Sequence, residues 1–464
     1  MTAVDAIARE AVLFAAVGFM VGGLDDLAID VIYGVHRLAR AMRLGRGDGD
    51  VLVAGSTRSP DVQPGDGRFA IFIPAWDEVA VIGAMLRHAL ATLRYPDYRI
   101  YVGTYPNDPA TIDAVAEVAA LDGRVRLVVG ARAGPTTKAD CLNALWQALQ
   151  RDSALPGGTV CAVVLHDAED VVHPDELHIF ASLIGEYASV QLPVLPLVDR
   201  HSRWVSGHYC DEFAEAHGKQ LVVRQLIGAG LPLAGVGCAL AFPMLARIAQ
   251  GKAQGPFDID SLTEDYEIGL HIAALGGRGV LARVRPAAGA PVAAVRAFFP
   301  GRIDAAVRQK ARWMTGIALA GWDRIGWTRW HDLGEHWMRM RDRRALVAVL
   351  VLLAAYLALV ASALSLAGHA LLGSSGNPGV IAPRWLLIAN ALLLLWRLAL
   401  RASFTGAAYG PAEALRSVPR MVVGNIIAML AARRALVQYW RLLRGVALRW
   451  DKTAHMFPDI NAAE

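Results

Sequence analysis

Hydrophobic residues occur in two different patterns along the chain. Long apolar runs lie near the N-terminus, at about 11–35, and toward the C-terminus, at 345–372 and 385–400. These runs approach or exceed the roughly 20 residues that an α-helix needs to cross a bilayer. Between them, short apolar runs alternate with polar stretches. The pattern predicts a folded central domain flanked by membrane-spanning helices.

The central part of the chain alternates between expected strands and expected helices. Runs rich in β-branched and aromatic residues predict strands at 69–76, 99–106, 125–131, 159–170 and 189–198. Helical patterns at 79–93 and 139–150 lie between some of these runs. Because strand–helix–strand alternation usually gives parallel strands, the fold class is expected to be α/β with a mainly parallel sheet. Ligands of such sheets bind beyond the carboxyl ends of the strands.

Arginines beside the apolar runs predict how the helices are oriented. The first run is followed by Arg37, Arg40, Arg43 and Arg46, and the second is preceded by Arg341, Arg343 and Arg344. Because positively charged flanks stay on the cytoplasmic side, the N-terminus is expected in the periplasm and the central domain in the cytoplasm. The chain is therefore expected to be a multi-pass inner-membrane protein.

These features divide the chain into five predicted parts. They are an N-terminal transmembrane anchor at 8–36, a polar linker at 37–68, a cytoplasmic domain at 69–343, a transmembrane hairpin at 344–401 and a cytoplasmic or interfacial segment at 402–464. The last part contains a weaker apolar stretch at 421–436, which is interrupted by Asn425, Arg433 and Arg434. We expect this stretch to be an interfacial or re-entrant helix.

Composition supports the membrane assignment and excludes other classes of protein. Hydrophobic residues make up 55% of the 464 residues and charged residues only 19%, which is more apolar than ordinary soluble domains. The formal net charge of +4 is too small to indicate a nucleic-acid-binding face. The four cysteines are dispersed without a CxxC pair, so neither a disulfide framework nor a zinc site is expected.

Three aspartates interrupt the first apolar run: Asp25, Asp26 and Asp30. An ionised carboxylate inside a membrane is costly, so such residues mark a functional site by default. The alternative is that they lie near the interface or pack against other helices, and we favour it.

The acidic sequence DAED at 167–170 forms the end of the apolar strand expected at 159–170. Carboxylates one residue apart at a strand end can share Mg²⁺ or Mn²⁺ and leave positions on the ion for diphosphate oxygens. Asp167, Glu169 and Asp170 are therefore candidate metal ligands, although an acidic turn after a strand is common without any metal. The nearby histidines match no zinc motif and are expected to be solvated: His166, His173 and His178.

The segment SLTEDYEIG, at 261–269, predicts the start of a helix. Ser261 and Glu264 have the spacing of a capping box, which places Asp265 in the first helical turn. These acids could simply complement the helix dipole. Alternatively, Asp265 could stay ionised there and act as a general base toward an attacking hydroxyl group.

A third candidate group lies in QKARW, at 309–313. Gln309, Arg312 and Trp313 have i, i+3 and i+4 spacing, so they share one face of the expected helix. An amide, a guanidinium and an indole together suit phosphate binding and stacking on a ring. An interfacial amphipathic helix is the alternative. Lys138, in GPTTKAD, could neutralise a phosphate or be a surface lysine, because its segment lacks phosphate-loop spacing.

In chain order, these motifs resemble the D, DxD, TED, QxxRW series of membrane-bound family 2 glycosyltransferases. The matching positions are Asp108, DAED at 167–170, TED at 263–265 and QKARW at 309–313. Further segments resemble the NfrB group, which is phage-adsorption protein B and its relatives: PAWDE at 74–78, GPTTKADCLN at 134–143, DEFAEAHGK at 211–219 and WDKTAHMFP at 450–458. The resemblance covers nearly the whole chain.

The resemblance implies a GT-A, Rossmann-like catalytic domain, a UDP-sugar donor, Mg²⁺ or Mn²⁺, and a role in bacterial exopolysaccharide or surface-glycan assembly. It implies donor binding by Asp108, Lys138, Asp167 and Glu169, an inverting transfer with Asp265 as base, and acceptor or diphosphate binding by Glu264, Gln309, Arg312 and Trp313. The second acid of the DxD motif is Glu169 here, so the metal ligand could be either Glu169 or Asp170.

Three functions fit these observations. The first is a synthase that elongates a polysaccharide, with an oligomer or an outer-membrane export partner completing the conduit. The second is a transferase that adds one sugar to a lipid-linked acceptor. The third is a non-enzymatic membrane scaffold or phage-receptor component. Arg416 and Arg420 have RxxxR spacing, which is by itself a weak signal of regulation by cyclic di-GMP.

Overall fold

The computed structural model describes residues 2–44, 52–53, 67–154, 159–286, 289–372, 382–446 and 456–458. Most of the linker expected at 37–68 and most of WDKTAHMFP at 450–458 lie outside these described residues. The first part of that linker, through Leu44, belongs to the N-terminal helix α1 (Thr2–Leu44).

The central domain is built on a seven-stranded sheet with the strand order β4-β3-β2-β5-β7-β6-β8. Its strands are β2 (Arg68–Pro74), β3 (Tyr98–Thr104), β4 (Val125–Val129), β5 (Val160–Leu165), β6 (Ser189–Gln191), β7 (Cys238–Ala241) and β8 (Gly279–Leu281). The first four are mutually parallel, and only β7 runs antiparallel to its neighbours. The expected α/β class with a mainly parallel sheet is confirmed.

Helices cover both faces of this sheet. The elements between and after the strands are α2 (Ile82–Thr92), α3 (Pro109–Leu121), α4 (Lys138–Ser153), α5 (Glu176–Leu183), α6 (Gly207–Glu215), η1 (Ala216–Gln220), α7 (Leu221–Leu226), α8 (Phe242–Ala249) and α9 (Glu264–Ala274). They are followed by β9 (Val284–Arg285), which pairs with β1 (Leu52–Val53), and by α10 (Ile303–Trp313), η2 (Met314–Ala320), α11 (Gly321–Ile325) and α12 (Leu333–Arg343).

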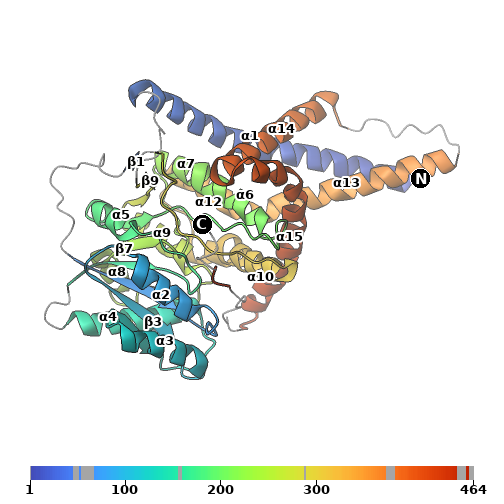
Figure 1. The fold of residues 1–464 in the computed structure, drawn as a ribbon. Helices are drawn as coiled ribbons and strands as arrows, with labels where there is room; N and C mark the ends of the chain where they lie inside the picture. The colour runs from blue at the N-terminus through green and yellow to red at the C-terminus, as the bar shows by residue number, and fades with distance from the viewer. Residues whose placement is uncertain are drawn as a thin grey trace.

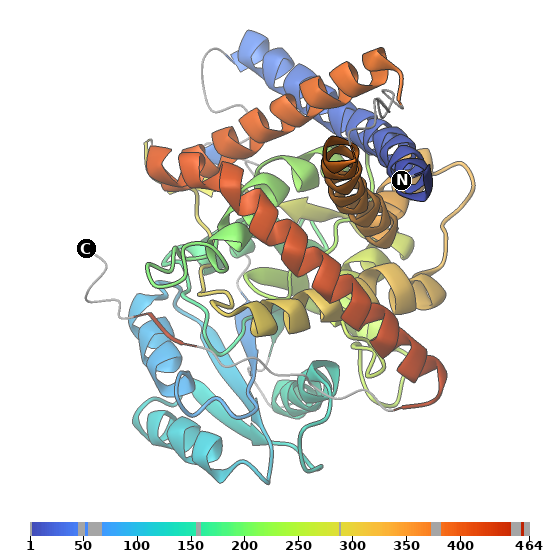
Figure 2. The same ribbon diagram turned by 90° about the vertical axis from the view of Figure 1, so that its right-hand side faces the viewer.

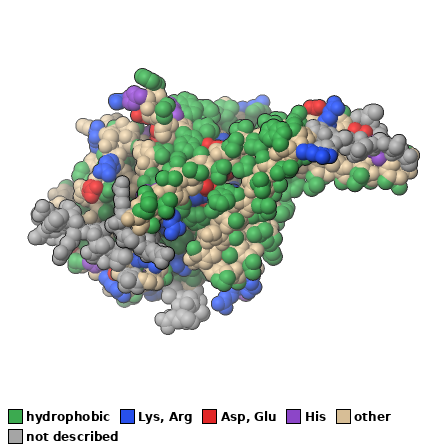
Figure 3. Space-filling view, turned by 90° about the horizontal axis from the view of Figure 1, so that it is seen from above, with side chains coloured by type: hydrophobic (Ala, Val, Ile, Leu, Met, Phe, Trp, Pro, Cys, Tyr) green, Lys and Arg blue, Asp and Glu red, His purple; other side chains and the backbone are tan. Residues whose placement is uncertain are grey.

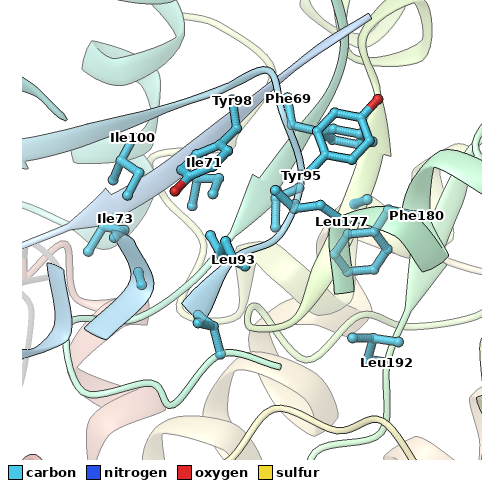
Figure 4. Packing of buried hydrophobic residues seen from close by; sticks show 14 of the residues in the cluster. Phe69, Ile71, Ile73, Leu93, Tyr95, Tyr98, Ile100, Leu177, Phe180 and Leu192 are labelled. Atoms are coloured by element: carbon cyan, nitrogen blue, oxygen red, sulfur yellow. The ribbon is translucent and has the colours of Figure 1, made fainter. Parts of the chain in front are cut away.

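Alternate side chains of the central strand β2 enter two different cores, as the period of a strand requires. Phe69, Ile71 and Ile73 pack with residues of α2, α3 and α5 on one face (Figure 4). Ala70 and Phe72 pack with residues of α4, α8 and α9 on the other face. Because β2 is buried on both sides, its sequence is a continuous apolar run rather than an alternating one.

Four long helices flank this domain: α1, α13 (Ala345–Leu371), α14 (Arg384–Tyr409) and α15 (Pro411–Leu443). In Figure 1, α1, α13 and α14 lie above the sheet, and α1 and α13 extend beyond the domain; Figure 2 shows α15 running along its side. All four are long and apolar enough to cross a membrane. The stretch at 421–436, which we expected to be an interfacial or re-entrant helix, is part of the 33-residue helix α15.

Hydrophobic side chains dominate the surface of the long helices. Seen from above, they cover much of the projecting arm formed by α1 and α13 (Figure 3). Leu359 and Leu366 of α13, for example, are exposed by more than half of their area. An apolar surface of this extent requires a bilayer or a partner to cover it. Which of the helices cross the membrane stays a prediction.

The aspartates of α1 are paired with cations of the central domain. Asp25 and Asp26 form ion pairs with Arg341 and Arg344 at the end of α12, and Asp30 pairs with Lys219 of η1. Pairing offsets the cost of removing these charges from water. The interpretation that the aspartates pack against other elements is confirmed, and their pairs hold α1 against the central domain.

Candidate active site

A cavity of about 650 Å³ opens beyond the carboxyl end of β5. Its lining brings together predicted residues from four separate segments of the chain: Lys138, Asp167, Glu169, Asp170, Glu264, Asp265, Gln309, Arg312 and Trp313. The strands place the acidic turn there because parallel sheets present their ligand sites at this edge.

Two acids of the DAED turn, Asp167 and Asp170, have different partners. The Asp167 carboxylate lies 2.5 Å from the Lys138 ammonium. Asp170 is buried, and its Oδ2 accepts the Asp167 backbone N–H at 2.9 Å and lies 2.9 Å from His166 Nδ1. Since that oxygen already has two partners, Asp170 shapes the turn. Asp167, Glu169 and Asp170 all line the cavity, and which of them would hold a metal ion stays a prediction.

His166 is buried rather than solvated, so the sequence prediction for this residue was wrong. Its two ring nitrogens lie 2.9 Å from Asp170 and 2.9 Å from Glu176. Burial lowers the pKa of the imidazole, but the two carboxylates outweigh burial and raise the pKa of His166 to about 10. The wrong prediction arose because Glu176 lies ten residues away along the chain, at the start of another helix.

Lys138 lies in the cavity at the first residue of α4, and its side chain is mostly buried. Burial lowers the pKa of its ammonium group, but Asp167, Glu264 and Asp265 outweigh burial, so the pKa is raised. Lys138 therefore stays charged at neutral pH and supplies a cation to the otherwise acidic end of the cavity. It is not a surface lysine.

The acids of TED lie where α9 begins. Glu264 is the first residue of the helix and Asp265 lies in the first turn, as expected. The expected capping box is absent from this helix start: Thr263 is the N-cap, and the Ser261 hydroxyl donates to Glu267 Oε1 at 2.7 Å. Ser261 instead tethers the preceding loop to the buried side of α9.

Both TED acids have raised pKa values. Burial raises the pKa of Glu264 to about 7, against the opposing charge of Lys138. Burial also raises the pKa of Asp265. Gly235, which the sequence did not single out, gives Asp265 its space: its φ is +73°, and a Cβ there would lie 2.6 Å from Asp265 Oδ2. Any side chain at this position would collide with the carboxylate.

The amide, guanidinium and indole of QKARW share the cavity wall, as their helical spacing predicted. The buried Gln309 Oε1 has no hydrogen-bond partner among the described residues. A buried amide oxygen without a partner is costly, and this oxygen can accept a hydrogen bond from the hydroxyl group of a ligand. Lys310 is directed elsewhere and pairs with Glu212 at 2.6 Å.

Asp108 lies outside the described residues that line the cavity. It is the N-cap of α3, where its Oδ1 accepts the Thr111 N–H at 3.3 Å, and its Oδ2 accepts the Asp77 N–H at 2.6 Å. Asp77 has a φ of 54°. The carboxylate thus fixes the turn after β2, and a contact between Asp108 and the nucleotide stays a prediction.

The cavity also extends to the long helices, which the sequence did not predict. Its wall includes Asp26 and Ile29 of α1 and Arg397 and Arg401 of α14. Arg397 pairs with Glu215, and Arg401 lies 3.1 Å from Asp211. In the sequence, arginines next to apolar runs indicated only how the helices are oriented in the membrane.

The acids of the DAED turn fit a divalent ion that is completed by its substrate. Within the described ranges, no three His, Cys, Asp or Glu side chains gather in a metal-binding arrangement. Two carboxylates, Asp167 and Glu169, nevertheless suit Mg²⁺ or Mn²⁺, which commonly takes one or two carboxylates and fills its other positions with phosphate oxygens and water.

Comparisons with known proteins agree with this geometry. A family model described as "Glycosyltransferase like family 2" matches residues 64–316. Bacteriophage adsorption protein B of Escherichia coli (strain K12) and bacteriophage N4 adsorption protein B of Escherichia coli O157:H7 are each 36% identical over 469 residues, which is 96% of this chain. The chain spans 62% of the length of these relatives.

A solved structure also resembles the fold. It is the mannosyltransferase PcManGT from Pyrobaculum calidifontis in complex with GDP-Man and Mn²⁺, with a TM-score of 0.54 and 18% identity over 92% of this chain and 99% of that one. At this identity the likeness concerns the fold alone. It confirms the GT-A fold expected from the motifs.

Proposed function

Because the chain belongs to the family 2 glycosyltransferases, we propose that it transfers a sugar from a nucleotide-sugar donor to an acceptor at the membrane surface. The observation that carries the proposal is the cavity, which gathers the DAED turn, the TED acids and the QKARW face within about 650 Å³. A carboxylate can serve as base, cations can stabilise a departing diphosphate, and an aromatic ring can stack on a sugar.

The proposed reaction is a direct displacement at the anomeric carbon. Asp265 accepts the proton of the acceptor hydroxyl group while its oxygen forms a bond to the sugar carbon. The bond from that carbon to the diphosphate breaks, and the diphosphate departs with the electron pair. Attack on the side opposite the leaving group inverts the configuration.

The remaining residues of the cavity stabilise the leaving group and place the sugars. Asp167 and Glu169 would hold Mg²⁺ or Mn²⁺, which stabilises charge on the diphosphate when bound. Lys138 and Arg312 add positive charge to the same region. Trp313 offers a ring face to a sugar. Gln309 offers a hydroxyl group an amide oxygen that has no partner in the described part of the chain.

The extent of the cavity supports a membrane-held acceptor. Side chains of α1, α12 and α14 line the cavity together with the TED acids. An acceptor attached to a lipid, or a growing glycan beside the helices, would reach Asp265 from that side. We therefore propose inner-membrane placement with the catalytic domain in the cytoplasm, elongation of an exopolysaccharide as the first candidate role, and addition of one sugar to a lipid-linked acceptor as the second.

The experiment that tests the function is release of nucleotide by the detergent-purified protein. UDP-sugars and GDP-sugars are supplied with Mn²⁺ or with EDTA, and the length of the products is analysed. We expect release from one donor class only with metal, and a decrease on the order of 10–100-fold or more in Asp167→Asn, which removes one metal ligand. Long products favour a synthase. If no donor gives nucleotide release, the result would count against an enzyme and favour the scaffold function.

The raised pKa values of the TED acids predict how the rate depends on pH. A carboxyl group with a raised pKa takes up its proton at higher pH, and the protonated form cannot act as a base. We expect kcat/KM to fall as the pH decreases from neutral to acidic values, because burial raises the pKa of Asp265 above that of an ordinary aspartate, and burial also raises the pKa of its neighbour Glu264, to about 7. Initial rates across the neutral range measure this. A kcat/KM that does not change across the neutral pH range would contradict a general base with a raised pKa.

A further inference from the structure

A buried histidine supports the DAED turn from behind. His166 follows β5 directly, and its side chain has no exposed surface. It does not line the cavity, so it cannot contact a sugar or a nucleotide there. Its role must therefore be exerted through the groups that it binds.

The ring of His166 makes two hydrogen bonds, and each of its two carboxylate partners accepts one further bond from a backbone N–H. On one side, Nδ1 lies 2.9 Å from Asp170 Oδ2, and this same oxygen accepts the Asp167 N–H at 2.9 Å. On the other side, Nε2 lies 2.9 Å from Glu176 Oε1, while Glu176 Oε2 accepts the His173 N–H at 3.1 Å. The imidazole thus connects the DAED turn to the beginning of α5.

This arrangement fixes the orientation of the turn. Asp170 can hold the Asp167 N–H only while its own carboxylate is kept in place, and His166 is the side chain that keeps it there. Without the imidazole, Asp170 Oδ2 would keep only the Asp167 N–H as a partner, and the carboxylate could rotate away from Asp167. The backbone carrying Asp167 and Glu169 would then lose its fixed shape.

We propose that His166 is a positioning residue for the donor, which fixes the turn that presents Asp167 and Glu169 to a metal-bound nucleoside diphosphate. The proposal rests on the proposed function. Partners that orient metal ligands commonly change metal affinity or activity by about 10–100-fold when they are removed. The effect should therefore appear mainly in donor binding.

Two substitutions separate positioning from stability. In His166→Asn, the amide nitrogen takes the place of Nδ1 and can still bind Asp170, whereas the bond to Glu176 is lost. In His166→Gln, the amide nitrogen takes the place of Nε2 and can still bind Glu176, whereas the bond to Asp170 is lost. Each variant loses one buried bond to a carboxylate, so both should lower the unfolding temperature by similar amounts.

The measurement is calorimetric titration of UDP and of GDP into the purified protein with Mn²⁺, together with donor KM and kcat. His166→Gln should weaken nucleotide binding and raise KM by about 10–100-fold, while His166→Asn stays within about threefold of the wild type. Equal affinities for His166→Gln and wild type, or equal losses in both variants, would overturn the proposal.

Two further outcomes are decisive. If His166→Gln does not fold, Glu176→Gln provides the second test, because it leaves the bond between His166 and Asp170 in place. Its nucleotide affinity must then stay near that of the wild type, and a tenfold loss would refute positioning through Asp170. If the wild-type protein binds neither nucleotide with Mn²⁺, the proposed function itself fails, and the role of His166 fails with it.

Discussion

Asp265→Asn should lower kcat by on the order of 10²–10⁴-fold, the usual contribution of a general base. Asparagine has nearly the same shape as aspartate but cannot accept the proton of the acceptor hydroxyl group at neutral pH. Because Asp265 does not hold the diphosphate in the proposed reaction, metal-dependent nucleotide binding should change little. Single-turnover transfer and calorimetric binding with Mn²⁺ measure the two quantities separately.

Asp260→Asn is the matched control. Asp260 is an exposed acid in the loop just before α9, and it lies outside the residues that line the cavity. We expect full activity in this variant. Full activity in Asp265→Asn would exclude Asp265 as the base. A loss of nucleotide binding as large as the loss of kcat would show that the residue binds the ground state rather than transferring a proton.

Arg420→Met should destabilise the protein by about 3–5 kcal/mol, the cost of removing one partner from a buried ion pair. Arg420 has no exposed surface. Its guanidinium donates to Asp211 Oδ1 at 3.0 Å and to the Gly207 carbonyl at 2.6 Å, and it also pairs with Glu413. Methionine would fill the volume but leave two buried carboxylates without this cation.

The other arginine of the RxxxR pair provides the control for this prediction. Arg416 is about one-third exposed and also pairs with Glu413. Arg416→Met should therefore cost less than about 1 kcal/mol. Denaturant titration of the detergent-purified variants, followed by tryptophan fluorescence, measures the difference. Equal stability of the two variants would show that the buried network of α6 and α15 contributes little to stability.

The structure gives Arg420 a structural role, which the RxxxR spacing did not indicate.

Much of the fold could be predicted because it depends on local patterns. Strands β2 to β5 and helices α2 and α4 appear near the predicted positions, since buried strands and amphipathic helices impose different spacings on apolar residues. The face shared by Gln309, Arg312 and Trp313 was predictable for the same reason. Short strands such as β7 and β8 carry too few residues to show a period.

Predictions failed where the partner of a side chain could not be read from its spacing in the sequence. Ser261 fits a capping box by spacing, but the helix begins at Glu264 and the hydroxyl group binds Glu267. His166 looked solvated because its partners become visible only when α5 packs behind β5.

Composition and spacings of a few residues were enough to predict the order of the elements, the apolar helices and the residue types available for chemistry. Which of these residues meet follows from the packing of the folded chain. Asp25 and Arg341 pair across more than 300 positions of the chain, and Asp167 meets Asp265 in one cavity. Such contacts depend on how sheet and helices pack, since a residue's neighbours across a core leave no periodic trace in the sequence.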